Sequence, residues 1–426
     1  MKNKNFKNHF LFVSLLLIIS SVLILSKSLS YNKIIVKDEE LVGTYIDGEY
    51  SDNIPKKDTG YVVEKIVCDN NAVGEWDYDN WGITLTNLSK KAKCNIHFRK
   101  GVKLADTINL ADTTGKCPTV NDDGTVNVTS AESENSLLCG APDAYGTSYY
   151  YRGNVTNNFV KFAGFYWRIV RINGDGSIRV IYDGTSAHEN GETSEDRIIG
   201  TSAFNEKYDD NAYIGYMYGT SGSSTYEETH VNINDSTIKT YIDTWYENSL
   251  KEYSQYLADN VFCDERSISS KFPTEEYNNL GYGKNSTVYK WFYSFGFGPA
   301  GQMNSDFSET LLCLNKNDSF TQSDDDKGNS NLKYPIGLIT MDELSLAGGY
   351  NIANNNFYLN IGVNYWTMTP CYVFENSARN HYVLYDGKIN YDNHVYTNYG
   401  VKPVINLKAN SLKSGDGTIN NPYTVE

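Results

Sequence analysis

The clearest hydrophobic pattern in the chain is a pair of β-prone runs that flank a turn sequence. Phe165–Ile172 and Ser177–Tyr182 are rich in β-branched and aromatic residues, and Asn173-Gly174-Asp175-Gly176 lies between them. Asn-Gly and Asp-Gly adopt positive φ at low cost, so the pattern predicts a β-hairpin. Three arginines interrupt its apolar strands: Arg168, Arg171 and Arg179. At least one face of the hairpin must therefore contact water or acidic partners.

The hydrophobic pattern also predicts two helices. Apolar and aromatic residues recur at helical spacing between Ser236 and Asp259. The aromatic stripe of this helix, including Tyr241 and Trp245, is expected to lie in the core rather than to bind a cofactor. Thr340-Met341-Asp342-Glu343 is a capping box and Gly348-Gly349 a stop signal, so a short second helix is expected between them.

The first thirty residues have the pattern of a targeting segment. Three lysines, at positions 2, 4 and 7, precede an uncharged apolar run from Phe10 to Leu25, and Lys27 ends it. The run is longer than most signal-peptide cores, and no typical cleavage site follows. We expect residues 1–30 to form a cytoplasmic stub and a signal-anchor helix, with a cleaved signal peptide as the alternative. The protein would then cross the cell membrane once, with the bulk of the chain extracellular.

Composition and strand signals divide the rest of the chain into three parts. Residues 31–103 predict a small all-β, sandwich-like module, in which a Cys68–Cys94 disulfide packs against Trp76 or Trp81. Residues 104–144 are polar and without periodicity, which predicts a linker. Residues 145–426 combine strands, two helices and long loops, which predicts an α+β domain.

Charge and cysteine content narrow the possible partners. The net charge of −15 argues against nucleic acid as a partner. Outside the membrane cysteines can pair, and chain order suggests three disulfides: Cys68–Cys94, Cys117–Cys139 and Cys263–Cys313. Cys371 is left over, and the absence of C-x-x-C spacing argues against a structural zinc site.

Five stretches occur in an order that resembles a known group of proteins: Tyr149-Tyr150-Tyr151-Arg152-Gly153, the hairpin, residues 336–340, residues 365–370 and residues 400–407. They resemble domains of bacterial surface proteins, related to the C-type-lectin-like fold of formylglycine-generating enzymes and of retroelement-diversified binding proteins. The resemblance covers about residues 145 to 410. It implies a C-type-lectin-like domain with a ligand face built from long loops, and it does not imply an activity.

Two kinds of chemistry are candidates, and both have simpler explanations. Cys371 with His381 and Arg379 could form a thiol nucleophile, because a thiol needs a base to become reactive. The enzymes of this fold use closely spaced cysteines late in the domain, however, and Cys371 has no near neighbour. Asp324 and Asp326 could contribute oxygen ligands to calcium, yet no downstream Glu completes a known loop, and a solvated acidic loop is the alternative. We predict no catalytic residues, no cofactor and no metal beyond this calcium.

The remaining hypothesis is recognition of a ligand. Between Asn354 and Tyr399 the chain is dense in Asn, Tyr and His, a combination that recognition surfaces use. The candidate residues are Tyr365, Tyr372, Asn376, Arg379, Asn380, His381, Tyr391, Asn393, His394 and Tyr396. We therefore expect a membrane-anchored extracellular binding protein, such as an adhesin, with a cell-surface glycan or protein as its ligand. A thiol-dependent oxidase using Cys371 and an architectural protein of the cell envelope are the alternatives.

Overall fold

The computed structural model describes residues 42–57, 59, 61–77, 80–87, 92–100, 117–128, 136–270, 278–293, 309–350, 352–354, 356–389, 391–412 and 414–425. The chain forms two compact units: residues up to Arg99 without residues 60–62, and residues from Lys100 onward together with residues 60–62. The predicted signal-anchor over residues 1–30 lies outside the described residues. Within them, no helix has the length and apolar character needed to cross a membrane.

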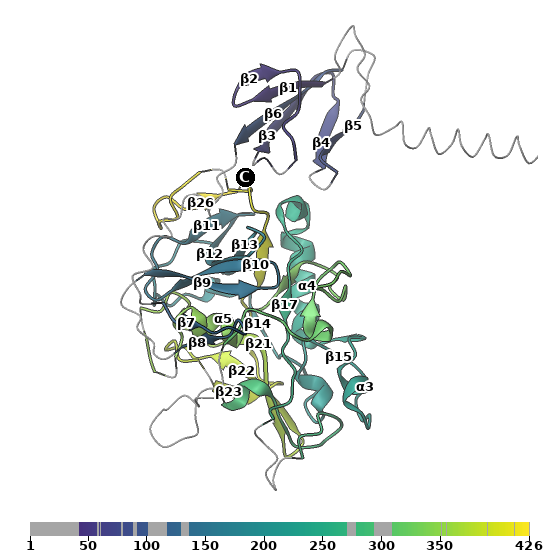
Figure 1. Cartoon of the computed structure of the whole chain (residues 1–426), viewed down its shortest axis with the longest axis vertical. Helices are drawn as coiled ribbons and strands as arrows, with labels where there is room; N and C mark the ends of the chain where they lie inside the picture. Colours follow the sequence, from purple (N-terminus) through teal and green to yellow (C-terminus); the bar gives the residue numbers. More distant parts are fainter. Residues whose placement is uncertain are drawn as a thin grey trace, which may run out of the picture. The chain divides into compact units, whose positions relative to one another are not determined.

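The first unit is built from six short strands (purple and dark blue in Figure 1). They are β1 (Val42–Ile46), β2 (Glu49–Ser51), β3 (Tyr61–Cys68), β4 (Val73–Asp77), β5 (Gly82–Thr86) and β6 (Cys94–Lys100). Four of them form a sheet in the order β2-β1-β6-β3, and β4 pairs separately with β5. β1 and β6 run parallel, while β1 and β2 form a hairpin whose turn residues Asp47 and Gly48 have positive φ.

The disulfide and the indoles of this unit occupy different clusters. The Cys68–Cys94 bond joins the end of β3 to the start of β6 and lies among Ile66, Ala72 and Ala92. Trp76 instead meets Phe98 edge to face, with ring centroids 5.0 Å apart, and Trp81 lies 5.4 Å from Trp76. The pairing of the cysteines was predicted correctly, whereas the indoles pack on a phenylalanine.

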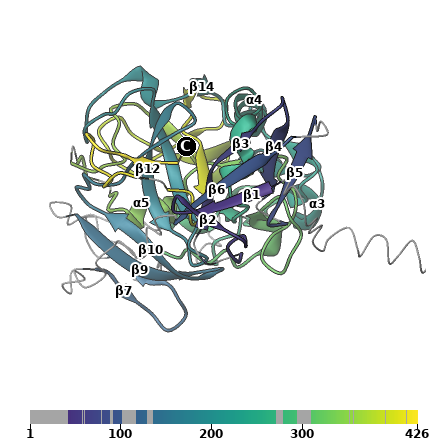
Figure 2. The ribbon, with the colours of Figure 1, turned by 90° about the horizontal axis from the view of Figure 1, so that it is seen from above.

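The second unit contains two larger sheets (Figures 1 and 2). The first comprises β9 (Leu137–Asp143), β10 (Gly146–Arg152), β11 (Phe159–Phe162), β12 (Phe165–Ile172), β13 (Ile178–Gly184), β20 (Ile336–Gly337), β25 (Val404–Leu407) and β26 (Tyr423–Thr424). Its order is β20-β25-β13-β12-β10-β9, and β11 pairs with β12 and β26. β12 and β13 are the predicted hairpin, with Gly176 in its turn at φ 85°.

The second sheet carries the C-terminal strands. It comprises β14 (Thr201–Ser202), β18 (Thr287–Val288), β21 (Tyr365–Phe374), β22 (Ser377–Val383), β23 (Tyr391–His394) and β24 (Tyr399–Gly400). The order is β14-β24-β21-β22-β23, with β18 on β21. Three two-stranded ladders complete the described strands: β7 (Thr119–Val120) with β8 (Val126–Asn127), β15 (Met217–Tyr218) with β16 (Asn234–Asp235), and β17 (Phe262–Cys263) with β19 (Ser319–Phe320).

Three α-helices lie within the described part of the chain: α3 (Tyr226–His230), α4 (Thr237–Ser249) and α5 (Met341–Leu346). The capping box of α5 is present, since Thr340 accepts from the Glu343 amide and Glu343 accepts from the Thr340 amide. α4 ends about ten residues earlier than its pattern predicts, and a 3₁₀ helix (Lys251–Tyr256) follows it. The tighter turn brings the chain onto β25, where the Ala258 amide donates to Asn406 and Tyr256 accepts from the Lys408 amide.

The segment predicted as a linker, residues 104–144, is in part a β-sheet. β7, β8 and β9 lie in it, and β9 pairs along its whole length with β10. Within this segment, the disulfide between Cys117 and Cys139 connects the residues before β7 to β9, and Val126 and Val128 are buried beside it. The strand signal of β9 is weak because Gly140 and Pro142, two residue types that are depleted in strands, interrupt Leu137–Asp143.

The arginines of the hairpin find acidic partners inside the protein. Arg171 Nη1 lies 2.9 Å from Asp143 Oδ2, and both Arg171 (3.1 Å) and Arg179 (2.5 Å) contact Glu343 Oε1. Burial alone would raise the pKa of Glu343, but Arg179 and Arg171 hold that pKa below its usual value. The Glu343 carboxylate therefore caps α5 and also balances the charges of Arg171 on β12 and Arg179 on β13. These contacts attach the helix to the hairpin.

Candidate ligand-binding face

The β21–β22 hairpin positions the first part of the candidate site. Its two-residue turn is Glu375-Asn376, whose φ values of 49° and 58° are those of a type I′ turn. Asn tolerates this conformation because its side chain can bond locally, and Asn376 is exposed in the turn. The register places Tyr372 of β21 opposite Arg379 of β22, and β23 places His394 opposite Arg379 on the other side.

Side chains from three segments then form a continuous cluster of rings and charges. Tyr208 and Tyr396 meet with centroids 4.8 Å apart, and Tyr396 stacks on His394 at 5.0 Å. The Arg379 guanidinium lies 5.4 Å from the centre of the Tyr372 ring. Tyr208 and Tyr396 remain 44% and 45% exposed, so both rings are open to solvent. We call Tyr208, Tyr372, Arg379, Asp392, His394 and Tyr396 the aromatic face.

The polar groups of the aromatic face hold one another in place. Arg379 Nη1 donates to Asp392 Oδ2 at 3.0 Å, and Nη2 donates to His394 Nε2 at 3.2 Å. Because Nε2 accepts, the proton of neutral His394 sits on Nδ1, which lies 2.5 Å from Ser377 Oγ. Partial burial and the Arg379 charge lower the pKa of His394, which keeps the ring neutral near pH 7. The face is thus ordered before any ligand arrives.

Tyr208 reaches the face from a loop far upstream in the sequence. The segment Asn205–Tyr208 is attached by main-chain bonds: the Asn205 amide donates to Val395, and the Ala378 amide donates to Tyr208. The sequence pattern treats residues 184–228 as a loop, and nothing in it marks Tyr208 as a partner of Tyr396. Only the run of polar and aromatic residues in this loop hints at a role.

Several of the predicted binding residues do not lie on this face. Tyr365, Asn380 and His381 are buried, so their prediction as surface residues was wrong. Tyr365 donates to the Leu359 carbonyl and Asn380 to the Ile214 carbonyl, so both serve the interior. Strand alternation explains Asn380, since Arg379 beside it points outward.

Two further predicted residues contribute hydrogen bonds near the aromatic face. Asn393 is half-buried, donates to the Tyr399 hydroxyl at 2.6 Å and accepts from the His394 amide. Tyr391 pairs through its backbone with Tyr382, which joins β23 to β22. The structure therefore brings together Tyr372, Arg379, His394 and Tyr396 from the predicted set, with Asn376 exposed in the adjoining turn.

The thiol of Cys371 lies in the interior. Cys371 is 1% exposed, and burial raises the pKa of its thiol well above the usual value. The other six cysteines form the three predicted disulfides, so no second thiol accompanies it. His381 is also buried, and its carbonyl accepts from Thr367. This environment favours the uncharged thiol, and Cys371 packs in the interior as an ordinary buried side chain.

The acidic loop around Asp324 and Asp326 is solvated and paired with lysines. Asp324 lies 2.8 Å from Lys316 and Asp326 lies 3.7 Å from Lys327, and the four side chains are partly to largely exposed. The amides of Lys327 and Gly328 donate to Asp325 and lower its pKa. Among the residues that the structure describes, no three His, Cys, Asp or Glu side chains form a group that could hold a metal ion.

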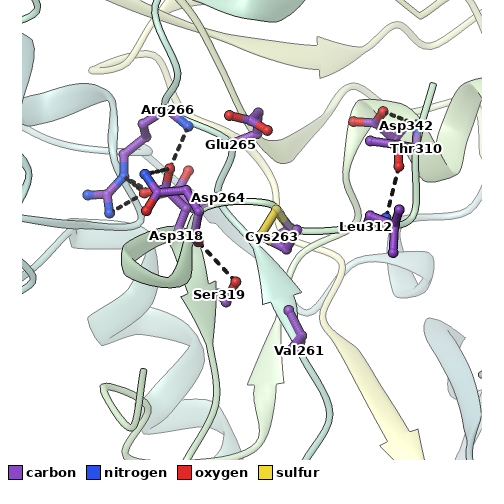
Figure 3. Close-up of a disulfide and its surroundings, with 12 residues drawn as sticks. Val261, Cys263, Asp264, Glu265, Arg266, Thr310, Leu312, Asp318, Ser319 and Asp342 are labelled. Atoms are coloured by element: carbon purple, nitrogen blue, oxygen red, sulfur yellow. Dashed lines mark hydrogen bonds and ion pairs between the residues drawn. A yellow bond between two sulfur atoms is a disulfide. The ribbon is translucent and has the colours of Figure 1, made fainter. Parts of the chain in front are cut away.

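A polar cavity beside the Cys263–Cys313 disulfide is too small for a substrate (Figure 3). Its volume is about 30 Å³, whereas one water needs ~10–15 Å³. Asp342 lies on its wall, accepts from Trp291 and Thr310, and has a pKa raised by burial to about 6. In Figure 3, Arg266 turns away from the disulfide toward Asp264 and Asp318. The cavity therefore has room for a few waters inside an ion-paired interior.

Comparison with known proteins identifies no relative: no protein-family model, no curated protein and no solved structure matches the chain.

Proposed function

We propose that this chain is a membrane-anchored extracellular binding protein whose C-type-lectin-like domain presents the aromatic face to a cell-surface glycan or protein. The observation that carries the proposal is the cluster of two exposed tyrosines, a histidine and an ion-paired arginine, held in contact before binding. Rigid aromatic rings offer contact area at low entropic cost, and a pre-ordered arginine adds directed donors. The three disulfides agree with an oxidising, extracellular location.

The two alternatives are less well supported. A thiol-dependent oxidase would need Cys371 accessible and ionisable, and its burial disfavours both. A purely architectural role predicts that the C-terminal aromatic residues are buried. Tyr365 and Tyr382 fit that prediction, but Tyr396, which is 45% exposed, does not.

The proposal is tested by probing the full-length chain, in detergent, against glycan and peptide arrays. We expect a restricted set of ligands, and at least tenfold weaker binding by the double variant Tyr208→Ala/Tyr396→Ala. Tyr385→Ala is the matched control, because Tyr385 is 61% exposed but follows the far end of β22. Absence of any ligand on both arrays, or equal losses from Y385A, would count against the aromatic face.

A further inference from the structure

A groove along α4 adjoins the aromatic face. It has a volume of about 670 Å³, within the range of ~300–1,000 Å³ typical of ligand sites. Tyr218, Tyr241 and Trp245 line it, and all three are half-buried. Trp245 is held by aromatic neighbours, with centroids 5.5 Å from Phe165 and 5.7 Å from Tyr182. The groove therefore has rigid aromatic rings in its lining.

The remaining lining is polar and includes hydroxyl and amide groups. Thr240, Thr244 and Asn248 line it from exposed positions of α4, and Asn205 and Glu206 line it from the neighbouring loop. The Thr240 and Thr244 hydroxyls donate to the Ser236 and Thr240 carbonyls, and the Asn248 amide donates to the Thr244 carbonyl. Their oxygens remain as acceptors, which suits a ligand rich in hydroxyl donors. An apolar peptide side chain could not donate to these acceptors, whereas a sugar hydroxyl could.

One wall residue carries an unmet hydrogen-bonding group. Asn205 is 3% exposed, and its Oδ1 accepts from the Lys207 amide. Its Nδ2 has no hydrogen-bond partner among the residues that the structure describes. A buried donor without an acceptor costs free energy, and a ligand hydroxyl entering the groove could supply the acceptor after a small side-chain rotation.

The charges of the groove argue against an anionic ligand. Lys207 is the one cationic residue in its lining, and Glu206 lies next to it in the chain. Asp235, the other carboxylate, lies 3.2 Å from Lys239. A sulphated or phosphorylated polymer would therefore meet no cluster of positive charge, and the net charge of −15 would repel it.

The geometry points to an uncharged oligosaccharide as the ligand of this groove, with C–H faces of the sugar rings against Trp245 and Tyr241 and hydroxyls on the polar rim. The inference rests on the proposed function and names the ligand class for it. Lys207 lines the groove, and the next residue, Tyr208, belongs to the aromatic face. The groove and the aromatic face therefore meet at this pair of neighbouring residues.

The test uses the full-length chain and uncharged oligomers of glucose and of N-acetylglucosamine, with heparin fragments as anionic comparison. Thr244→Tyr fills the groove from an exposed position without removing a core contact, and Glu247→Tyr is the control on the same helix outside the groove. We expect the uncharged oligomers to bind, to change the tryptophan fluorescence, and to bind at least tenfold more weakly to T244Y than to E247Y. Trp245→Phe should abolish most of the fluorescence change.

Each other outcome has a defined meaning. Equal binding by T244Y and E247Y would overturn the groove as the site, while loss in Y208A/Y396A would keep the proposed function. Binding by the heparin fragments alone would overturn the ligand class. Absence of binding by every oligomer, with both variants folded by circular dichroism, would overturn the inference, whereas the array experiment decides the proposed function.

Discussion

Two arginine–carboxylate arrangements show how this protein uses charge differently inside and outside. Arg171 and Arg179 share Glu343 in the interior, where all three side chains are at most 6% exposed. Arg379 pairs with Asp392 on the aromatic face, where the two side chains are 32% and 21% exposed. Removing a partner of a buried pair leaves an uncompensated charge, whereas water replaces a lost partner at the surface. The first arrangement therefore holds the fold, and the second orients partly exposed groups at the surface.

The largest effect is expected from Glu343→Gln. The amide keeps the shape of the side chain but leaves Arg171 and Arg179 with less negative charge, so the free energy of unfolding should fall by about 3–5 kcal/mol. Urea denaturation followed by circular dichroism measures the change. Glu252→Gln, on an exposed 3₁₀ turn, is the matched control and should change stability by less than about 0.5 kcal/mol. A loss below about 1 kcal/mol in E343Q would mean that the interior arginines do not depend on this carboxylate.

A second, smaller effect concerns pH. Burial raises the pKa of Glu309 to about 7, and the side chain accepts from Ser345 Oγ at 2.5 Å. The pKa of Glu309 is higher in the folded state than in the unfolded state. The stability that this side chain contributes is therefore fully present below about pH 4.5 and is lost as the pH rises through 7. The wild-type chain should lose about 3 kcal/mol of stability relative to Glu309→Gln across this window. Thermal unfolding at pH 5, 6, 7 and 8 would reveal the difference, and parallel profiles would contradict it.

The smallest effect on stability is expected from Asp392→Asn. The pair is partly exposed, so the free energy of unfolding should change by less than about 1 kcal/mol. Ligand binding should nevertheless weaken severalfold, because Arg379 loses the bond that directs it toward His394 and Tyr372. Asp324→Asn, which removes an exposed partner of Lys316, should leave both quantities unchanged. A large stability loss in D392N would erase the distinction between the two arrangements.

Local signals in the chain predicted the scaffold better than the site. The hairpin at Asn173–Gly176, the capping box at Thr340–Glu343 and the three disulfides follow from turn chemistry, capping and chain order, which are short-range properties. β9 was missed because Gly140 and Pro142 interrupt its run of apolar residues. The acidic partners of the hairpin arginines were expected as a class, but Asp143 and Glu343 could not be named.

The binding residues depended on long-range placement. Composition alone put Asn380 and His381 with Arg379, whereas strand alternation and sheet packing buried the first two. Tyr208 and the groove residues of α4 were not predicted as binding residues, although their side chains are at least partly exposed. Tyr241 and Trp245 have helical spacing typical of a core, yet they are half-buried at its edge. The position of Tyr241 and Trp245 relative to the surface depends on the path of residues 205–208, and no local sequence pattern predicts that path.

The attachment of residues 205–208 has a consequence for how specificity can change. This segment is held by its own main chain, through Asn205 to Val395, Tyr208 to Ala378 and Glu206 to the Thr237 hydroxyl. Substituting the side chains of Glu206, Lys207 or Tyr208 leaves those anchors intact. If the proposed site binds a ligand, its specificity can therefore change by exchange of three outward residues while the backbone that holds them stays the same.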